Sequence, residues 1–118
     1  MSNEPTIEQM NEAICDFMGG YRKIEGPDYC INVYKGPDEI EWETGKYLKY
    51  HSLWDWLMPV GKKIFTLLAE MMKQRPPHTV CRGDFLEVDI HCHIREYDII
   101  KAHKAIYEFI KWYNKNRN

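Results

Sequence analysis

Two histidines and two acids in the second half of the chain are the side chains whose types and spacing could do chemistry. Glu87, Asp89, His91 and His93 alternate with apolar residues, as the polar face of a β-strand does. On such a strand the Cβ atoms of His91 and His93 would lie about 7 Å apart, close enough to share a metal ion. One hypothesis from this spacing is a zinc-type site with His91, His93 and Glu87 as metal ligands.

The same four residues have two other interpretations. Carboxylates beside imidazoles can exchange protons near neutral pH, which is the chemistry of an acid/base enzyme. They can also form a solvated strand face, because His, Asp and Glu are costly to bury. We favour the solvated face, since two histidines without a third fixed ligand are a weak metal signal. We therefore expect no cofactor.

The chain also offers no convincing nucleophile. Its only serines are Ser2 and Ser52, and Ser52 is expected to cap a helix. The cysteines lack Cys-x-x-Cys spacing and a secretory leader, so we expect free, reduced thiols. They are Cys15, Cys30, Cys81 and Cys92. A function without catalysis is therefore favoured.

Composition and charge limit the classes of partner. With 118 residues, 44% apolar and 29% charged, the chain can bury a core as one domain. Its apolar runs are shorter than the ~20 residues that a membrane span needs.

A net charge of −2 gives no positive field for nucleic acid. Nucleic acid stays a minor alternative through Trp112, Lys111 and Lys115, where a base could stack. The start carries no export signal, so we expect a cytoplasmic location.

Hydrophobic periodicity predicts the elements that must position these side chains. A Thr6–Gln9 capping box starts a first helix that ends at Gly19. A last helix begins near Asp98 and carries a narrow apolar stripe. Arg82-Gly83-Asp84 is expected to be the tight turn of a hairpin. The predicted strands are 29–34, 39–42, 46–48, 79–81 and 85–94.

The strongest predicted element is a helix from Ser52 to Lys73. Its apolar residues cover roughly 200° of the helix surface, far more than an ordinary surface helix shows. Pro59 projects to the polar side, where it bends the helix without ending it. Such an arc needs cover from two directions, from a sheet and from either a neighbouring helix or a second copy of the protein. The residues expected at that interface are Trp54, Trp56, Met58, Phe65 and Met72.

Together these elements predict a single α+β domain over residues 1–118. It would hold an antiparallel sheet of four to five strands with three helices, and an α/β/α three-layer sandwich is the alternative arrangement.

One stretch of the sequence resembles a known signature. YHSLWDWLMPVGKKI, from Tyr50 to Ile64, is similar to the phage ABA sandwich domain family, small uncharacterised proteins of phages and prophages of gut bacteria. NEAICDFMGG (11–20) and FIKWYN (109–114) resemble its flanks. The resemblance implies a sheet between helical layers, and it brings no established activity, cofactor or catalytic residue.

The function that we predict is that of a non-enzymatic phage or prophage accessory protein. It would bind itself, as a homodimer or larger homo-oligomer, or a host or phage protein, through apolar surface around the central helix. The alternative function is a metal-dependent or acid/base enzyme that uses the His/Glu/Asp strand face.

Overall fold

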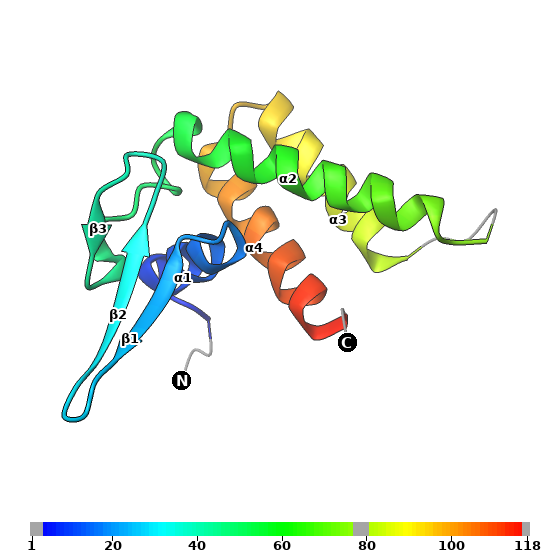
Figure 1. The fold of residues 1–118 in the computed structure, drawn as a ribbon. Helices are drawn as coiled ribbons and strands as arrows, with labels where there is room; N and C mark the ends of the chain where they lie inside the picture. Colours follow the sequence, from blue (N-terminus) through cyan, green and yellow to red (C-terminus); the bar gives the residue numbers. More distant parts are fainter. Residues whose placement is uncertain (1–3, 77–80, 117–118) are drawn as a thin grey trace.

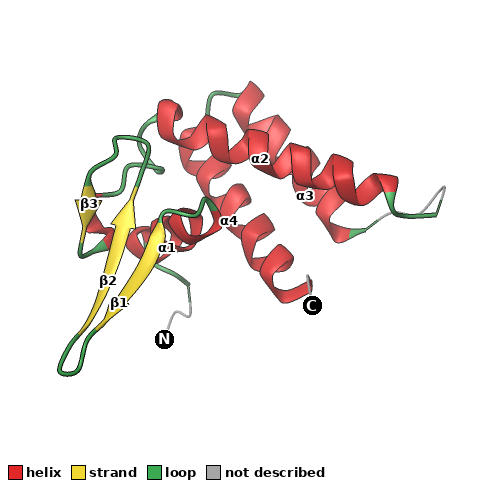
Figure 2. Ribbon diagram, in the orientation of Figure 1, coloured by secondary structure: helices red, strands yellow, loops and turns green. Residues whose placement is uncertain are grey.

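In the computed structural model, which describes residues 4–76 and 81–116, a small antiparallel sheet lies beside a group of helices (Figure 1). Figure 2 shows the sheet at one end and α2, α3 and α4 together at the other. The α+β class is confirmed, but the predicted numbers are wrong, because the described residues form three strands and four α-helices. The elements are α1 Ile7–Phe17, β1 Tyr21–Glu25, β2 Cys30–Lys35, β3 Glu41–Trp42, the short 3-10 helix η1 Gly45–Tyr47, α2 Trp54–Lys73, α3 Arg82–Arg95 and α4 Ile99–Asn116.

Helix α1 begins as its sequence predicts. The Thr6 hydroxyl accepts a hydrogen bond from the Gln9 amide at 3.1 Å, and the Gln9 side chain accepts one from the Thr6 amide at 2.9 Å. This reciprocal pair satisfies two amide donors that the first turn leaves without a helical partner. The helix ends before Gly19, whose φ of +80° is a conformation that glycine adopts without strain.

Removing this cap gives a first testable prediction. Thr6→Ala should lower the free energy of unfolding by about 1 kcal/mol, because the Gln9 amide loses its acceptor. Urea denaturation followed by circular dichroism measures the change. Thr6→Ser is the matched control, since it keeps the hydroxyl, and it should stay close to the original protein. Equal losses in the two variants would contradict the capping role.

The sheet has the order β1-β2-β3, and α1 packs on one of its faces. Tyr34 of β2 joins the two, because its hydroxyl donates to the Glu12 carboxylate at 2.6 Å. Burial, and next the Glu12 carboxylate, raise the pKa of Tyr34. The opposite face carries the exposed Ile24 and an Arg22–Glu41 ion pair of 2.9 Å. Among the described residues no helical layer covers that face, so the three-layer alternative is wrong.

Two further strand predictions in this region need correction. The predicted strand 39–42 is reduced to Glu41–Trp42, and Lys46 to Leu48, also predicted as a strand, lies largely in η1. Thr44 explains the difference, since its hydroxyl accepts from the Lys46 amide at 3.3 Å and starts a tight turn.

Helix α2 runs unbroken from Trp54 to Lys73, with Pro59 inside it on the exposed side. The predicted cap is wrong: Leu53 occupies the N-cap position without a side-chain bond, and the Ser52 hydroxyl instead donates to the Lys49 carbonyl at 3.4 Å. Residues Lys49 to Leu53 form a turn. The N-cap of α2 therefore lies one residue later than the capping pattern predicts. The helix is nevertheless the long central element that its apolar arc predicts.

The largest correction concerns the second half of the chain. Residues 85–94, predicted as a long strand, lie in helix α3, and the expected Arg82-Gly83-Asp84 hairpin turn is its first turn. Of the partner strand, Thr79 and Val80 lie outside the described residues, and Cys81 is the N-cap of α3. The tripeptide is engaged in packing, because Asp84 pairs with Arg75 and Gly83 lies against Trp112.

The core lies where α1, α2, α3 and α4 meet, and α3 and α4 form a tightly packed pair. Trp56 connects this core to the sheet end, because its ring lies against Gly36 and 5.2 Å from the Tyr50 ring centroid. Among residues 4–76 and 81–116, no helix combines the length and the apolar character of a membrane span. The side chains with no more than 1% exposure include Ile14, Leu48, Tyr50, Leu57, Val60, Ile64, Ile90, Ile106, Phe109 and Ile110.

Candidate interaction surface

The outward side of α2 carries a line of apolar side chains, which we call the α2 stripe: Met58, Phe65, Ala69 and Met72. An open hollow of about 440 Å³ lies along it, and Lys62, Thr66 and Glu70 also line this hollow. The neighbouring α3 adds Phe85 and Val88 on its own outward side. The exposed fractions are 43% for Met58, 61% for Met72, 59% for Phe85 and 58% for Val88.

The five residues predicted at an interface differ in how much of each side chain is exposed. Met58 and Met72 are exposed, and Trp54 and Phe65 are half-buried. Trp56 is only 5% exposed and belongs to the core. Helix α3, which was predicted as a strand, packs beside α2 and covers part of the broad arc. The chain itself therefore supplies the second cover, and only the α2 stripe at the rim of the arc remains open.

The three residues of the hypothetical metal site lie on a helix, so the expected shared strand face is wrong. Glu87 and His91 are one turn apart, with 3.7 Å between Glu87 Oε1 and His91 Nε2. His93 is two residues further on and therefore points to a different side of α3, 3.8 Å from Glu96. No group of three or more His, Cys, Asp or Glu side chains in the described parts of the chain is placed to hold a metal ion.

His91 has a packing role instead. Its ring stacks on Phe65 of α2, with 4.0 Å between ring centroids and 11° between planes. The stack connects α2 to α3 and covers one side of the Phe65 ring. The imidazole lies on an exposed helix surface and is not among the side chains that line the hollow along the α2 stripe.

A buried polar network links three distant segments. The Asn11 side chain of α1 donates to the Leu48 carbonyl at 3.1 Å and lies 2.9 Å from His51 Nδ1. His103 Nε2 of α4 lies 2.8 Å from Asn11 Oδ1. These distances let one amide connect α1, α4 and the segment before α2 inside the core.

The Leu48 carbonyl determines which atoms of this network donate hydrogen bonds and which accept them. Because a carbonyl only accepts, the amide nitrogen of Asn11 must face Leu48, and its oxygen must face His103. His103 Nε2 then carries a proton and donates, while His51 Nδ1 accepts from the second amide hydrogen. His103 is 2% exposed, and burial, followed by the nearby His51, lowers its pKa to about 4. The His103 imidazole is therefore uncharged near pH 7.

Two other cavities are larger or more enclosed, but neither gathers reactive groups. A shallow one of about 620 Å³ lies over Trp42 and Tyr47, whose ring centroids are 4.4 Å apart, with His51 at its edge. The Nδ1 atom of His51 is already engaged by Asn11, so it is not free to take a proton from a substrate there.

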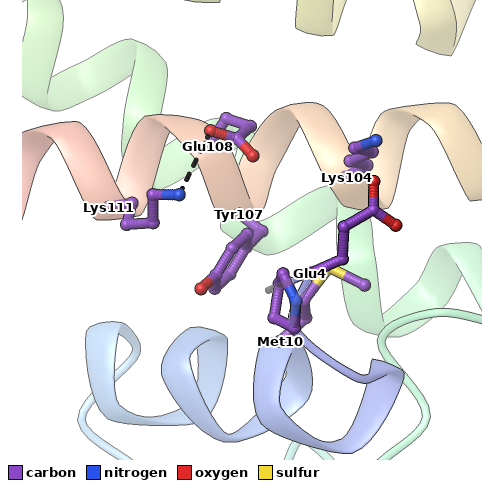
Figure 3. A pocket seen from close by; sticks show the side chains of 7 residues that line it. Glu4, Met10, Lys104, Tyr107, Glu108 and Lys111 are labelled. Carbon is purple, nitrogen blue, oxygen red and sulfur yellow. Dashed lines mark ion pairs between the residues drawn. The ribbon is translucent and has the colours of Figure 1, made fainter. Parts of the chain in front are cut away.

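The other cavity, of about 410 Å³, lies between the start of the chain and α4 (Figure 3). Figure 3 shows the Glu4 carboxylate beside Lys104, and Glu108 pairs with Lys111 at 3.8 Å. Tyr107 lies between these charges, and the Lys111 ammonium is 5.6 Å from its ring centroid. Acids and bases balance one another in this cavity, which leaves no excess charge for an ionic ligand.

Neither Asn11 nor His103 is predicted from the sequence as part of a polar network. A signal was present, because each is a polar residue within the apolar side of its helix. Two such residues in one small core are expected to pair with each other. Pattern alone could not reveal that partner, since 92 positions separate them.

Comparison with protein-family models, with curated proteins and with solved structures finds no significant match to the chain.

Proposed function

We propose that this protein is a non-enzymatic binding protein that docks another polypeptide on the α2 stripe and the adjoining outward side of α3. The supporting observation is the exposure of Met58, Met72, Phe85 and Val88 on two neighbouring helices. Grouped apolar side chains of this size are uncommon on surfaces that stay in water and are typical of contact surfaces. Methionine adapts well to a partner, because its side chain is unbranched and polarisable.

The enzyme alternative has less support. Glu87 and His91 face each other across one helical turn, and His93 lies apart from both. The hollow along the α2 stripe contains Lys62 and Glu70 as its only ionisable groups among the described lining residues. An acid/base reaction needs its donor and acceptor to converge on one enclosed substrate, and these groups do not converge.

A phage or prophage setting is part of the proposal and comes from the resemblance of Tyr50 to Ile64 to the phage ABA sandwich domain family. Phage structural, lysis or packaging genes beside the gene would support this setting. Host metabolic genes on both sides would count against it.

The binding proposal predicts which exposed residues matter. In cells that express two differently tagged copies, the original protein should retain either the second copy or another defined protein. Met58→Asp combined with Val88→Asp should reduce that retention at least tenfold, because two charges would then be desolvated at the contact. Quantitative mass spectrometry after affinity purification measures it.

Ile100→Asp provides the matched control. Ile100 is 75% exposed on α4 and lies outside the α2 stripe, so its replacement should leave retention unchanged. Circular dichroism must show that all variants fold. If the double variant retains every partner that the original protein retains, the proposed function is wrong.

A further inference from the structure

We infer that the polypeptide that docks on the α2 stripe is a second copy of this chain, with the two α2 helices antiparallel around a two-fold axis near Phe65. The inference rests on the proposed function and names its partner. It follows from the order of apolar and charged residues along the exposed side of one helix.

The apolar residues of the stripe are symmetric about Phe65. Met58 lies seven residues before it and Met72 seven residues after it, so all three share one side of α2. In an antiparallel pair centred on Phe65, Met58 of one copy meets Met72 of the other, and the two Phe65 rings meet at the axis. Each apolar side chain then has an apolar partner, as a two-fold interface requires of a single surface.

Two charges beside the stripe differ in sign between the ends of α2. Asp55 lies in the first turn of the helix and Lys73 in its last turn. Asp55 and Lys73 are 18 residues apart, five turns of helix, and therefore lie on the same side. Antiparallel pairing brings Asp55 of one copy near Lys73 of the other at both ends of the contact. In a parallel two-fold pair the same two residues would lie on opposite flanks of the contact and would not meet.

These charges are available for such contacts. Asp55 makes no ion pair with any other described residue. Glu70 and Lys73 form a pair of 3.6 Å, but both are mostly exposed, and pairs of that kind contribute little and exchange readily. A foreign partner would have to carry the same reversed order of charges, whereas a second copy carries it necessarily.

Sedimentation over a range of concentrations, with reductant because Cys30 and Cys92 are exposed, tests the inference. The original protein should form dimers, and Met58→Asp should weaken dimerisation at least tenfold. Asp55→Lys and Lys73→Asp should each weaken it about tenfold, since each places like charges together. The double variant Asp55→Lys/Lys73→Asp should return to within about threefold of the original, because both contacts regain opposite signs.

A monomer at 200 μM, or a double variant as weak as either single one, would overturn the inference. Unchanged dimerisation in both single variants would also overturn it, because only an antiparallel pair brings these two residues together. If the chain is a monomer yet loses another protein in the Met58→Asp/Val88→Asp variant, the inference fails and the proposed function stands. Far-ultraviolet circular dichroism confirms that each variant keeps its helices.

Discussion

Replacing Trp56 with alanine should lower the free energy of unfolding by about 4 kcal/mol, one of the two largest effects expected for this protein. Its ring lies against Tyr50 and fills the space beside Gly36, at the point where α2 meets the sheet end. Truncation removes a buried aromatic surface and leaves a cavity that the glycine backbone cannot fill. Urea denaturation at pH 7.5, followed by circular dichroism, measures the loss.

Trp54→Ala is the matched control for this prediction. Trp54 is the same residue type, two positions earlier on α2, and it is half-buried rather than enclosed. Its loss should be about half that of Trp56→Ala or less, because less apolar area leaves water contact at this position. Equal losses at the two positions would mean that Trp56 does not fill a closed site between α2 and the sheet.

The second large effect is a dependence of stability on pH that arises from His103. Its pKa is about 4 in the folded protein and 6.5 ordinarily, so the unfolded chain binds an additional proton between these values. The contribution of His103 is complete above pH 6.5 and is lost as the pH falls towards 4. The free energy of unfolding should fall by about 2 kcal/mol from pH 7 to pH 5, and by about 3 kcal/mol in total at lower pH.

The control for this effect keeps the hydrogen bond and removes the titration. In His103→Gln the side-chain amide can still donate to Asn11, and its slope between pH 7 and pH 5 should be clearly smaller than that of the original protein. Other shifted groups act outside this window, because the pKa of Asp84 is lowered by Arg75 and that of Cys15 is raised by burial. Identical slopes in the two proteins would exclude His103 as the cause.

The sequence was sufficient to predict the helices whose apolar residues recur with one period. Helices α1, α2 and α4 each carry such a pattern, and α1 also carries an explicit start signal in Thr6 and Gln9. Local chemistry determines these elements, so their existence is readable without knowledge of the rest of the fold. The first residue of a helix was harder to predict, because the N-cap of α2 is Leu53 and not Ser52.

Helix α3 was mistaken for a strand because the spacing of its apolar residues fits both the two-residue period of a strand and the ~3.6-residue period of a helix. Leu86, Val88 and Ile90 alternate as in a strand, yet Leu86 and Ile90 are also one helical turn apart. Only Leu86 and Ile90 are buried, and Val88 faces water. The choice between the periods is made by packing on α2 and α4, which no local pattern contains.

The candidate site was predictable only in part. The apolar arc of α2 pointed to Met58 and Met72, which are indeed exposed. It could not separate them from Trp56, because Trp56 is enclosed by Gly36 and Tyr50 from other segments. Phe85 and Val88 were assigned to a strand, so their exposure on a helix that neighbours α2 could not be foreseen.

The hydrogen bond between Asn11 and His103 has a consequence for the order in which the protein is made. A ribosome releases α1 first, but the partners that bury Asn11 and support Ile14 include α4, about ninety residues later. Helices α2, α3 and α4 follow one another and can pair as soon as they emerge, whereas α1 must wait. A nascent chain that stops before α4 leaves the apolar side of α1 uncovered, and such chains should be preferred targets for chaperones and proteases.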